Sequence, residues 1–227
     1  MSKATRLSPP PLVSFCGIDG AGKTSLAESL AALLAGTGIP TRVVWGGYTP
    51  LLLRPIIGVA KRLMGQRDGP NTHEGNYVER KRSLLRQTIL GKVYLRVLLL
   101  DYLFGSSFQV KFPGRLGKIL ICDRYVPDFL VNISPDLGLD DAARRRLLSW
   151  LFRWLPQPAI VFLLDVPEEV ALARKADTPS LAYLRDRREI YLKLGTDQGY
   201  VRLDGTRSRD ALLEEVVAHT LEVIGHE

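Results

Sequence analysis

The feature that most constrains the fold of this chain is a glycine-rich octapeptide at residues 17–24, Gly-Ile-Asp-Gly-Ala-Gly-Lys-Thr. It matches the pattern G-x-x-x-x-G-K-[ST]. A strand-like run, Leu12 to Cys16, precedes it, and apolar residues at helical spacing follow it from Thr24 to Leu34. The glycines let successive backbone N–H groups converge on phosphate oxygens, and the following helix adds its positive N-terminal end. The sequence therefore predicts a strand, a phosphate-binding loop and a helix, in that order.

Two side chains of this loop have the chemistry that binding of ATP and Mg²⁺ requires. We expect Lys23 to contact the β- and γ-phosphates as a catalytic residue, and Thr24 to ligate Mg²⁺. The residues expected to bind the ATP phosphates are Gly17, Asp19, Gly20, Ala21, Gly22, Lys23, Thr24 and Ser25.

A second acidic group for the metal stands at the end of another strand-like run. Lys118 to Cys122 is apolar and β-like, and Asp123 follows it directly. In open α/β sheets, ligands bind in the crevice outside the carboxyl ends of the strands. We therefore predict that Asp123 binds Mg²⁺ together with Thr24 and takes part in catalysis. Capping of a helix N-terminus is the alternative role for this aspartate.

The fold class follows from continuous apolar strands that alternate with helical stretches. Such a pattern indicates a parallel sheet that crossover helices cover on both faces, which is a three-layer α/β architecture. Helical candidates are Val78 to Phe104, with a possible kink at Gly91, and Asp141 to Leu155. The expected strands are Leu12 to Cys16, Thr41 to Trp45, Lys118 to Cys122, Ala159 to Leu164 and Tyr200 to Leu203.

Length and composition favour one globular domain. The chain has 227 residues, of which 46% are hydrophobic, and we expect a flexible tail at 1–10 and a single domain at 11–227. Charged residues and proline interrupt the most apolar windows, so no transmembrane segment is expected. The two cysteines, Cys16 and Cys122, lie in β-like runs and are expected to be buried thiols. A cytoplasmic location fits these features.

A net charge of +7 is compatible with nucleic acid, an anionic membrane surface or a site for several phosphates. The sequence contains no RNA-binding aromatic signature, zinc finger or helix-turn-helix pattern, so nucleic acid is not an expected partner. A guanine-specific switch protein would carry an Asn-Lys-x-Asp tetrapeptide, which is absent. Motor ATPases usually need longer chains. A kinase for a small phosphorylated acceptor fits the length.

Several motifs together resemble the thymidylate kinase family in order and spacing over most of the chain. They are residues 17–24, Asp123-Arg124-Tyr125, the run from Pro158 to Asp165, Pro167-Glu168-Glu169 with Arg174, and Leu203-Asp204-Gly205-Thr206. The resemblance implies a five-stranded P-loop kinase fold with a mobile lid after the fourth strand. It also implies Mg-ATP-dependent phosphorylation of a nucleoside monophosphate, and thymidylate (dTMP) is the first candidate.

The resemblance also implies roles for individual residues. Asp19 is expected to reach the sugar hydroxyl of the acceptor and Arg124 to hold its phosphate, because arginine offers a planar fork to a phosphate. Tyr125 is a further expected acceptor residue, and the aromatic rings of Trp45 and Tyr48 are expected to stack on the acceptor base. Trp45 ends a strand, and its alternative role is that of a core residue.

The lid is expected at about 175–188 and is rich in basic residues. An arginine that closes over the phosphates neutralises developing charge during transfer, and Arg174 is the candidate for this catalytic role. Lys175, Arg185 and Arg188 are further lid candidates. The alternative for each of them is a solvated helix face with local ion pairs.

Two departures from the family pattern fall on the acceptor site. Thymidylate kinases typically carry Arg-Glu-Pro-Gly after the second strand, where this chain has Val-Trp-Gly-Gly-Tyr at 44–48. An arginine and aromatic set around the base is replaced by the sequence at 98–102. A divergent branch of the family is therefore expected. Alternatives are a kinase for a deoxynucleoside or sugar, or a nucleotide-dependent regulatory module with weak ATPase activity. A homodimer formed through Val78 to Phe104 is a further family-based expectation.

Overall fold

The computed structural model describes residues 11–51, 54, 82–86, 88–112, 118–175 and 180–225. The strands are β1 (Leu12–Gly17), β2 (Thr41–Trp45), β3 (Ile119–Asp123), β4 (Ile160–Asp165) and β5 (Val201–Asp204). The helices are α1 (Lys23–Gly36), α4 (Ile89–Ser106) with the π-helical turn η1 (Ser107–Lys111), α5 (Val126–Leu137), α6 (Asp141–Phe152), α7 (Glu168–Arg174), α8 (Leu181–Gln198) and α9 (Arg209–Ile224).

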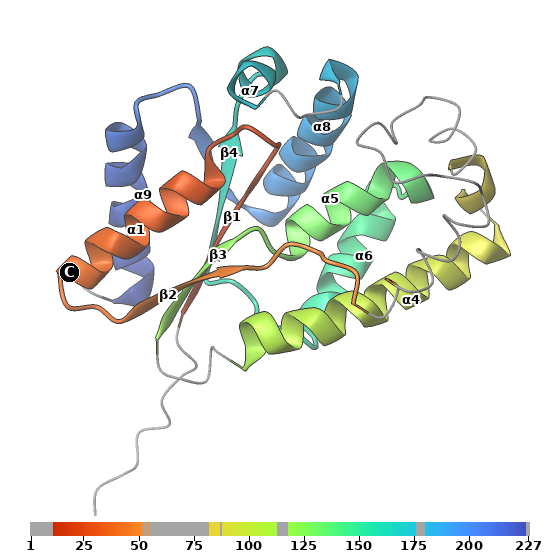
Figure 1. The fold of residues 1–227 in the computed structure, drawn as a ribbon, viewed down its shortest axis with the longest axis horizontal. Coiled ribbons are helices and arrows are strands. Elements are labelled where there is room, and N and C mark those ends of the chain that lie inside the picture. The colour runs from red at the N-terminus through yellow and green to blue at the C-terminus, as the bar shows by residue number, and fades with distance from the viewer. Residues whose placement is uncertain are drawn as a thin grey trace, which may run out of the picture.

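The five strands form one parallel sheet in the order β2-β3-β1-β4-β5, as the strand pattern predicted. The chain leaves β1 toward β2 and β3 on one side and later adds β4 and β5 on the other (Figure 1). The carboxyl end of β1 is therefore the point where the winding direction reverses, and ligands bind at such points in open α/β sheets. Phe15 of β1 is in register with Asp123 of β3, which places the end of β3 beside the octapeptide.

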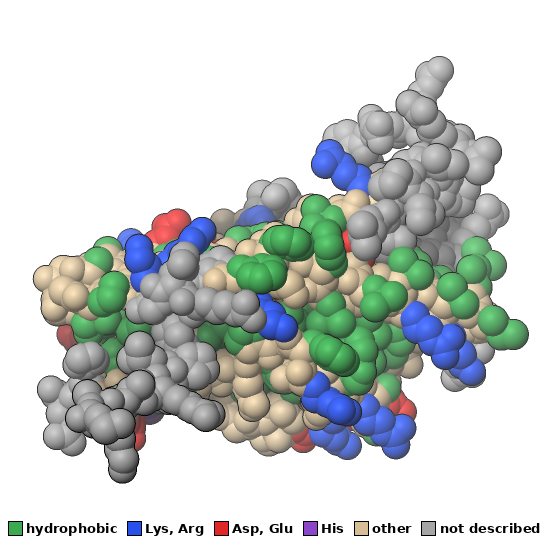
Figure 2. Space-filling model, turned by 90° about the horizontal axis from the view of Figure 1, so that it is seen from below, with side chains coloured by type: hydrophobic (Ala, Val, Ile, Leu, Met, Phe, Trp, Pro, Cys, Tyr) green, Lys and Arg blue, Asp and Glu red, His purple; other side chains and the backbone are tan. Residues whose placement is uncertain are grey.

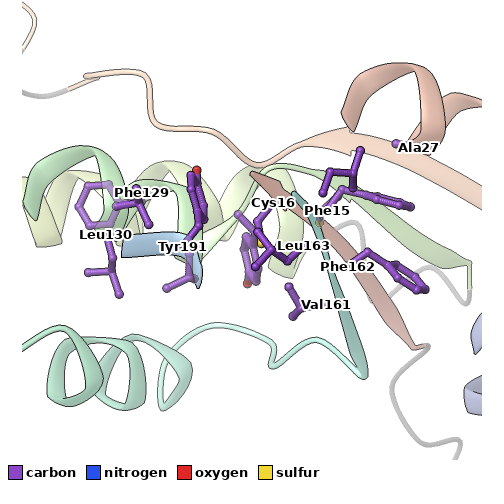
Figure 3. Close-up of a cluster of buried hydrophobic side chains, with 14 of the residues drawn as sticks. Phe15, Cys16, Ala27, Phe129, Leu130, Val161, Phe162, Leu163 and Tyr191 are labelled. Atoms are coloured by element: carbon purple, nitrogen blue, oxygen red, sulfur yellow. The ribbon is translucent and has the colours of Figure 1, made fainter. Parts of the chain in front are cut away.

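Helices cover both faces of the sheet. Figure 1 shows α1 and α9 together on one face, and α5 and α8, with α6 behind them, on the other. Side chains follow the period of two of a strand. Phe15 and Phe162 stack with ring centroids 5.3 Å apart on the α1 face, whereas Cys16 and Leu163 point to the face of Tyr191 (Figure 3). Both cysteines are buried, as predicted.

The prediction of one long helix from Val78 to Phe104 is wrong. Residues 78–81 lie outside the described residues, 82–85 are helical, and α4 begins only at Ile89. Thr88 caps α4, because its hydroxyl accepts a hydrogen bond of 3.0 Å from the backbone N–H of Gly91. A Cβ on Gly91 would lie 1.8 Å from the carbonyl oxygen of Leu85, so this glycine permits a close approach of the preceding turn and is not a kink.

Large apolar side chains are exposed on α4 and η1. Figure 2 shows apolar side chains gathering on the face that is seen from below Figure 1. The homodimer expected through this region remains a prediction. None of the helices in the described part of the chain is long and apolar enough to cross a membrane. The exposed apolar residues of α4, η1 and the residue after it are Ile89, Leu90, Val93, Leu100, Phe104, Phe108 and Phe112.

Candidate active site at the carboxyl edge of the sheet

The octapeptide forms a tight loop between β1 and α1. Gly20 has φ of 85°, and a Cβ at this position would lie 2.2 Å from the carbonyl oxygen of Ala171. Gly17 has φ of 143°, and its Cβ would lie 2.6 Å from the carbonyl oxygen of Leu164. Both the backbone conformation and the close contact require glycine. The loop is therefore packed against β4 and α7, with its backbone in a curled form suited to an anion.

The Lys23 side chain lies inside this loop. It is 4% exposed, and its Nζ donates to the carbonyl oxygens of Gly17 at 2.8 Å and Ile18 at 2.7 Å. Burial lowers the pKa of Lys23 and the nearby Arg124 adds to this effect, although Asp128 and other aspartates oppose it. An ammonium group has three N–H donors, so Lys23 can serve the loop carbonyls and still meet a phosphate oxygen.

Thr24 and Asp123 meet although they are far apart in sequence. The Thr24 hydroxyl donates a hydrogen bond of 2.6 Å to Asp123 Oδ2. Asp123 is 5% exposed, and its Oδ1 is buried without a hydrogen-bond partner among the described residues. A buried carboxylate oxygen needs a partner, and a hard cation or its water would supply one.

This pair fits Mg²⁺, which usually takes one or two carboxylates together with substrate phosphates. The described residues contain no cluster of three or more His, Cys, Asp or Glu that could hold a metal ion by themselves. The alternative role of Asp123 as a helix cap does not apply here. The residue that precedes α5 is Tyr125, and its backbone N–H donates to Asp128 Oδ2 at 3.4 Å.

Arg124 lies between two carboxylates on the α5 side of the loop. Its Nη2 is 2.6 Å from Asp19 Oδ1, and its Nη1 is 3.6 Å from Asp128 Oδ1. Its φ of 70° is rare for a residue with a side chain and aims the guanidinium toward the loop end of the crevice. Burial opposes the charged form, but Asp128 and Asp19 outweigh it and raise the pKa of Arg124. Arg124 is thus a permanent cation beside the phosphate-binding loop.

A cavity of about 260 Å³ lies on the opposite side of the loop, next to α1 and α9. Arg174, at the end of α7, donates from Nη1 to the carbonyl oxygen of Gly205 at 2.9 Å and forms one wall. Sequence reasoning missed Arg207 and Arg209, which also line this cavity. Their position just after the carboxyl end of β5 is the signal that could have found them, because strand ends meet at one edge of a parallel sheet.

Known proteins with related sequences agree with this arrangement. A thymidylate kinase of Xylella fastidiosa (strain 9a5c) is 29% identical over 227 residues, covering 94% of this chain and 91% of the relative. A thymidylate kinase of Fervidobacterium nodosum is 25% identical over 215 residues, covering 90% of this chain and 95% of the relative. A probable thymidylate kinase of Sulfurisphaera tokodaii is 27% identical over 217 residues, covering 92% and 94%. The chain is similar to thymidylate kinases along nearly its whole length.

No family model matches the chain, so the similarity rests on these relatives. The enzyme class of the chain is that of the ATP-dependent nucleotide kinases. The sheet order and the P-loop agree with the fold that the resemblance implied.

Two of the expected lid cations are engaged in ion pairs. Arg185 Nε lies 2.8 Å from Glu168 Oε1, and Arg188 contacts both Glu168 and Asp165 at 3.1 and 2.6 Å. This arrangement corresponds to the alternative expected for Arg185 and Arg188, a solvated helix face with local ion pairs. Of the expected lid at 175–188, residues 176–179 lie outside the described residues and 181–188 form the first turns of α8.

Lys175 acts electrostatically on a residue of the phosphate-binding loop. The side chain of Asp19 is partly buried, which opposes ionisation, but Arg124, Lys23 and Lys175 together lower the pKa of its carboxyl. Lys175 directly follows Arg174 and is exposed. Arg174 and Lys175, at the end of α7, therefore both remain candidates for contacting the phosphates of the substrates. Activity measurements are the test of this prediction.

The three aromatic residues expected at the acceptor site differ in placement. Tyr125 is fully buried and donates its hydroxyl to the carbonyl oxygen of Pro156 at 3.0 Å, so its side chain belongs to the core and not to the acceptor site. Trp45 is 45% exposed, so its alternative role as a core residue is wrong. Tyr48 is half-buried and donates to Asp101 Oδ2 at 2.8 Å, with its ring edge against Phe129. Acceptor contacts of Trp45 and Tyr48 remain predictions.

Asp128 is expected to give this kinase a pH dependence on the acid side. The carboxyl is 1% exposed, and burial raises its pKa from 3.8 to about 6, although Lys23, Arg124 and the Tyr191 hydroxyl favour its charged form. As pH falls through about 6, a neutral Asp128 no longer holds Arg124. We expect kcat/KM for the acceptor to fall over that range, and Asp128→Asn to lower it roughly fivefold at neutral pH and to remove this pH step.

The free energy of unfolding should depend on pH in the opposite direction to kcat/KM. The two effects of Asp128 can therefore be distinguished. A carboxyl whose pKa is raised in the folded state stabilises the protein below its unfolded pKa, and this contribution is lost as pH rises through about 6. Asp128→Asn should therefore not lower the free energy of unfolding at pH 7.5. The exposed Asp186→Asn on α8 is the matched control. A pH profile of Asp128→Asn identical to that of the wild type would contradict the assignment.

Proposed function

We propose that the protein transfers the γ-phosphoryl group of ATP to a nucleoside monophosphate, with thymidylate as the first acceptor to test, and that Mg²⁺ assists the transfer. The observation that carries this proposal is the position of two cationic groups around one loop. Lys23 lies within the loop, and Arg124 lies beside it on the face covered by α5. Two polyanions can be brought together only where cations face both of them.

ATP is expected to enter from the side of α1 and α9. The cavity of about 260 Å³ opens beside the first turn of α1, and ligand sites in proteins are concave spaces of comparable size. Gly22 and Ser25 line the cavity, so a nucleoside placed there has its phosphates at the octapeptide. Arg174 lines the same cavity and can move from the Gly205 carbonyl to a phosphate oxygen.

The acceptor is expected on the side of α5 and α8. Arg124 would bind its phosphate through a bidentate contact, in competition with the carboxylate of Asp19 at 2.6 Å. Once Arg124 turns to the phosphate, Asp19 is free to accept a hydrogen bond from a sugar hydroxyl. Lys23 lies between the two sides and stabilises charge on the group that is transferred. When Mg²⁺ is bound by Thr24 and Asp123, it neutralises charge on the phosphates of ATP.

The test is ADP formation from Mg-ATP with thymidylate, other nucleoside monophosphates, free nucleosides and sugars added one at a time. At least one nucleoside monophosphate should stimulate turnover at least about tenfold above the background, since positioning of the acceptor supplies much of phosphoryl-transfer catalysis. Stimulation by a free nucleoside or sugar alone would replace the acceptor class. ATP binding without any acceptor-dependent turnover would favour a regulatory module. A cytoplasmic location is part of this proposal, because both substrates are cytoplasmic metabolites.

A further inference from the structure

The outward face of α4 and η1 carries a continuous row of exposed apolar side chains, which we call the apolar strip. Figure 2 shows this side of the molecule, where apolar side chains gather over a broad area and lysine and arginine side chains lie nearby. Single exposed apolar residues are normal in proteins, but a contiguous exposed patch indicates an interaction site. The apolar strip comprises Ile89, Val93, Leu100, Phe104, Phe108 and Phe112.

Helical spacing keeps the apolar strip on one side of α4. Its members within α4 are separated by four or seven residues, which is the spacing of a single helix face. Leu100 of this face is 60% exposed, whereas Leu98, Leu99 and Tyr102 are buried in the core. Helix α4 therefore has two apolar faces, one packed inside the protein and one left to solvent. A helix that only covers a protein core has a polar outer face.

Three phenylalanines extend the apolar strip beyond the end of α4. The ring centroids of Phe104 and Phe108 are 5.0 Å apart, and those of Phe108 and Phe112 are 5.5 Å apart. Positions spaced by four drift around an α-helix, but here the chain makes a π-helical turn, in which the Phe112 N–H donates to the Ser107 carbonyl oxygen at 3.0 Å. This wider turn offsets the drift and keeps the third ring in line. The three rings contact one another and remain about half exposed.

The charged residues in this part of the chain are almost all cationic. From Arg82 to Cys122 the sequence has seven lysines and arginines and one aspartate, so this stretch supplies most of the net charge of +7. The aspartate is Asp101, which is 1% exposed and accepts hydrogen bonds from the Tyr48 hydroxyl and the Leu51 backbone N–H. It is the one acidic residue in the sequence of α4. The outward face of α4 therefore carries no acidic side chain.

Two of the cations lie beside the apolar strip. Lys92 and Arg96 are both exposed, and because they are four residues apart they follow one border of the strip. A third cation, Lys111, belongs to η1 and directly precedes Phe112. Aromatic and aliphatic side chains on one face, bordered by lysine and arginine, are the composition of helices that lie in a membrane interface.

The sign of these charges distinguishes between possible partners. In a symmetric homodimer both copies present the same surface, so the cations of two copies of α4 would come together without an acidic side chain of α4 to compensate them. The surface of an anionic bilayer has the opposite charge, and its acyl boundary takes up aromatic and aliphatic side chains. None of the described helices is long and apolar enough to cross a membrane, so the contact is with the surface alone.

We propose that α4 and η1 attach the protein to the surface of an anionic bilayer. The apolar strip inserts between the lipid headgroups, and Lys92 and Arg96 pair with lipid phosphates. Helix α4 then lies in the plane of the interface. The net charge of +7, which is compatible with several anionic partners, is explained mainly by this surface. The inference concerns a surface outside the candidate active site and does not depend on the proposed function.

The test is flotation of the purified full-length protein with vesicles that contain phosphatidylglycerol and phosphatidylcholine, compared with vesicles of phosphatidylcholine alone. We expect binding to the anionic vesicles to be at least about tenfold stronger, since each lysine or arginine near the surface adds to the attraction. Raising the salt concentration should weaken this binding, because salt screens exposed charges.

A double variant of the rings tests the apolar component. Phe108→Gln with Phe112→Gln should weaken binding to the anionic vesicles at least about tenfold, because each inserted ring contributes buried apolar area. Leu33→Gln with Val223→Gln removes two exposed apolar side chains of α1 and α9 and is the matched control with wild-type binding. The thermal unfolding midpoint should stay near the wild-type value in both, since all four side chains are exposed.

A double variant of the cations tests the electrostatic component. Lys92→Gln with Arg96→Gln should weaken binding to the anionic vesicles at least about tenfold and leave the weaker binding to phosphatidylcholine unchanged. Lys193→Gln, which removes an exposed cation of α8, should change neither. ADP formation in the absence of vesicles should match the wild type in each variant, because none of these residues lies at the phosphate-binding loop.

Three results would overturn the inference. The first is the absence of binding to anionic vesicles, and the second is equal binding of the wild type and the two double variants. The third is a dimer in light scattering that Phe108→Gln with Phe112→Gln converts to a monomer, without vesicle binding by the wild type. That result would assign the apolar strip to a second copy of this chain.

Discussion

Lys23→Ala is expected to lower ATP-dependent turnover by about 1,000-fold, which is the upper range for loss of one preorganised donor at a developing charge. The ammonium is enclosed by the loop, where it is 4% exposed and held by two carbonyl oxygens at 2.7 and 2.8 Å. None of the other described lysines is buried, so none is enclosed by the loop as Lys23 is. The loss should appear in kcat with the acceptor present and in the background ATPase activity alike.

The measurement is ADP formation under saturating Mg-ATP and acceptor, together with circular dichroism to confirm the fold. Lys193→Ala removes an exposed lysine of α8 and serves as the matched control with wild-type turnover. The variant leaves the carbonyls of Gly17 and Ile18 without their donor, which is expected to cost about 1 kcal/mol of unfolding free energy. If Lys23→Ala retained more than about a tenth of the wild-type turnover, the octapeptide would not be the site of phosphoryl transfer.

Local sequence signals predicted the elements that position this site. Strand β2 runs from Thr41 to Trp45 as predicted, and each of the other strands begins or ends within one residue of its predicted bounds. Strands β1, β3 and β4 are buried on both faces, so their apolar runs are continuous and end abruptly. The octapeptide was also recognisable from local sequence. Its glycines adopt backbone conformations and close contacts that no other residue permits.

What the sequence could not show depends on contacts between distant residues. Arg185 and Arg188 have the spacing of a lid, but whether they face phosphates or Glu168 depends on how α7 packs against α8. Tyr125 follows Arg124 directly, yet the positive φ of Arg124 sends one side chain to the crevice and the other to the core. The hydrogen bond from the Tyr191 hydroxyl to Asp128 likewise exists only because α5 and α8, about 50 residues apart, pack together.

The start of α4 escaped prediction for a different reason. Helical spacing of apolar residues continues through the break, so periodicity alone gives one helix from Val78 to Phe104. The break is marked only by Thr88, a good N-cap, and by Gly91, which lets Leu85 approach closely. Both residues are also tolerated inside helices, so their effect could be recognised only from the structure.

Asp123→Asn is expected to lower Mg-ATP-dependent turnover by about 100-fold or more and to shift its dependence on Mg²⁺ to higher concentration. The carboxylate accepts from Thr24 at 2.6 Å through one oxygen, and its other oxygen is buried without a partner among the described residues. Asparagine keeps the shape and can still accept from Thr24, but it has no charge with which to hold a divalent cation. The Asp123→Asn variant therefore distinguishes a metal-binding role of Asp123 from a structural one.

The measurement is a titration of ADP formation with Mg²⁺ at fixed ATP, with calorimetry of ATP binding in the presence and absence of the metal. A metal-binding role predicts that Asp123→Asn binds free ATP like the wild type but gains little affinity when Mg²⁺ is added. Asp186→Asn, an exposed aspartate of α8, controls for the loss of one negative charge. An unchanged Mg²⁺ midpoint together with a lower unfolding temperature would instead make Asp123 a structural partner of Thr24. The buried Asp123 Oδ1, which has no partner among the described residues, is the atom that a cation would contact in the metal-binding role.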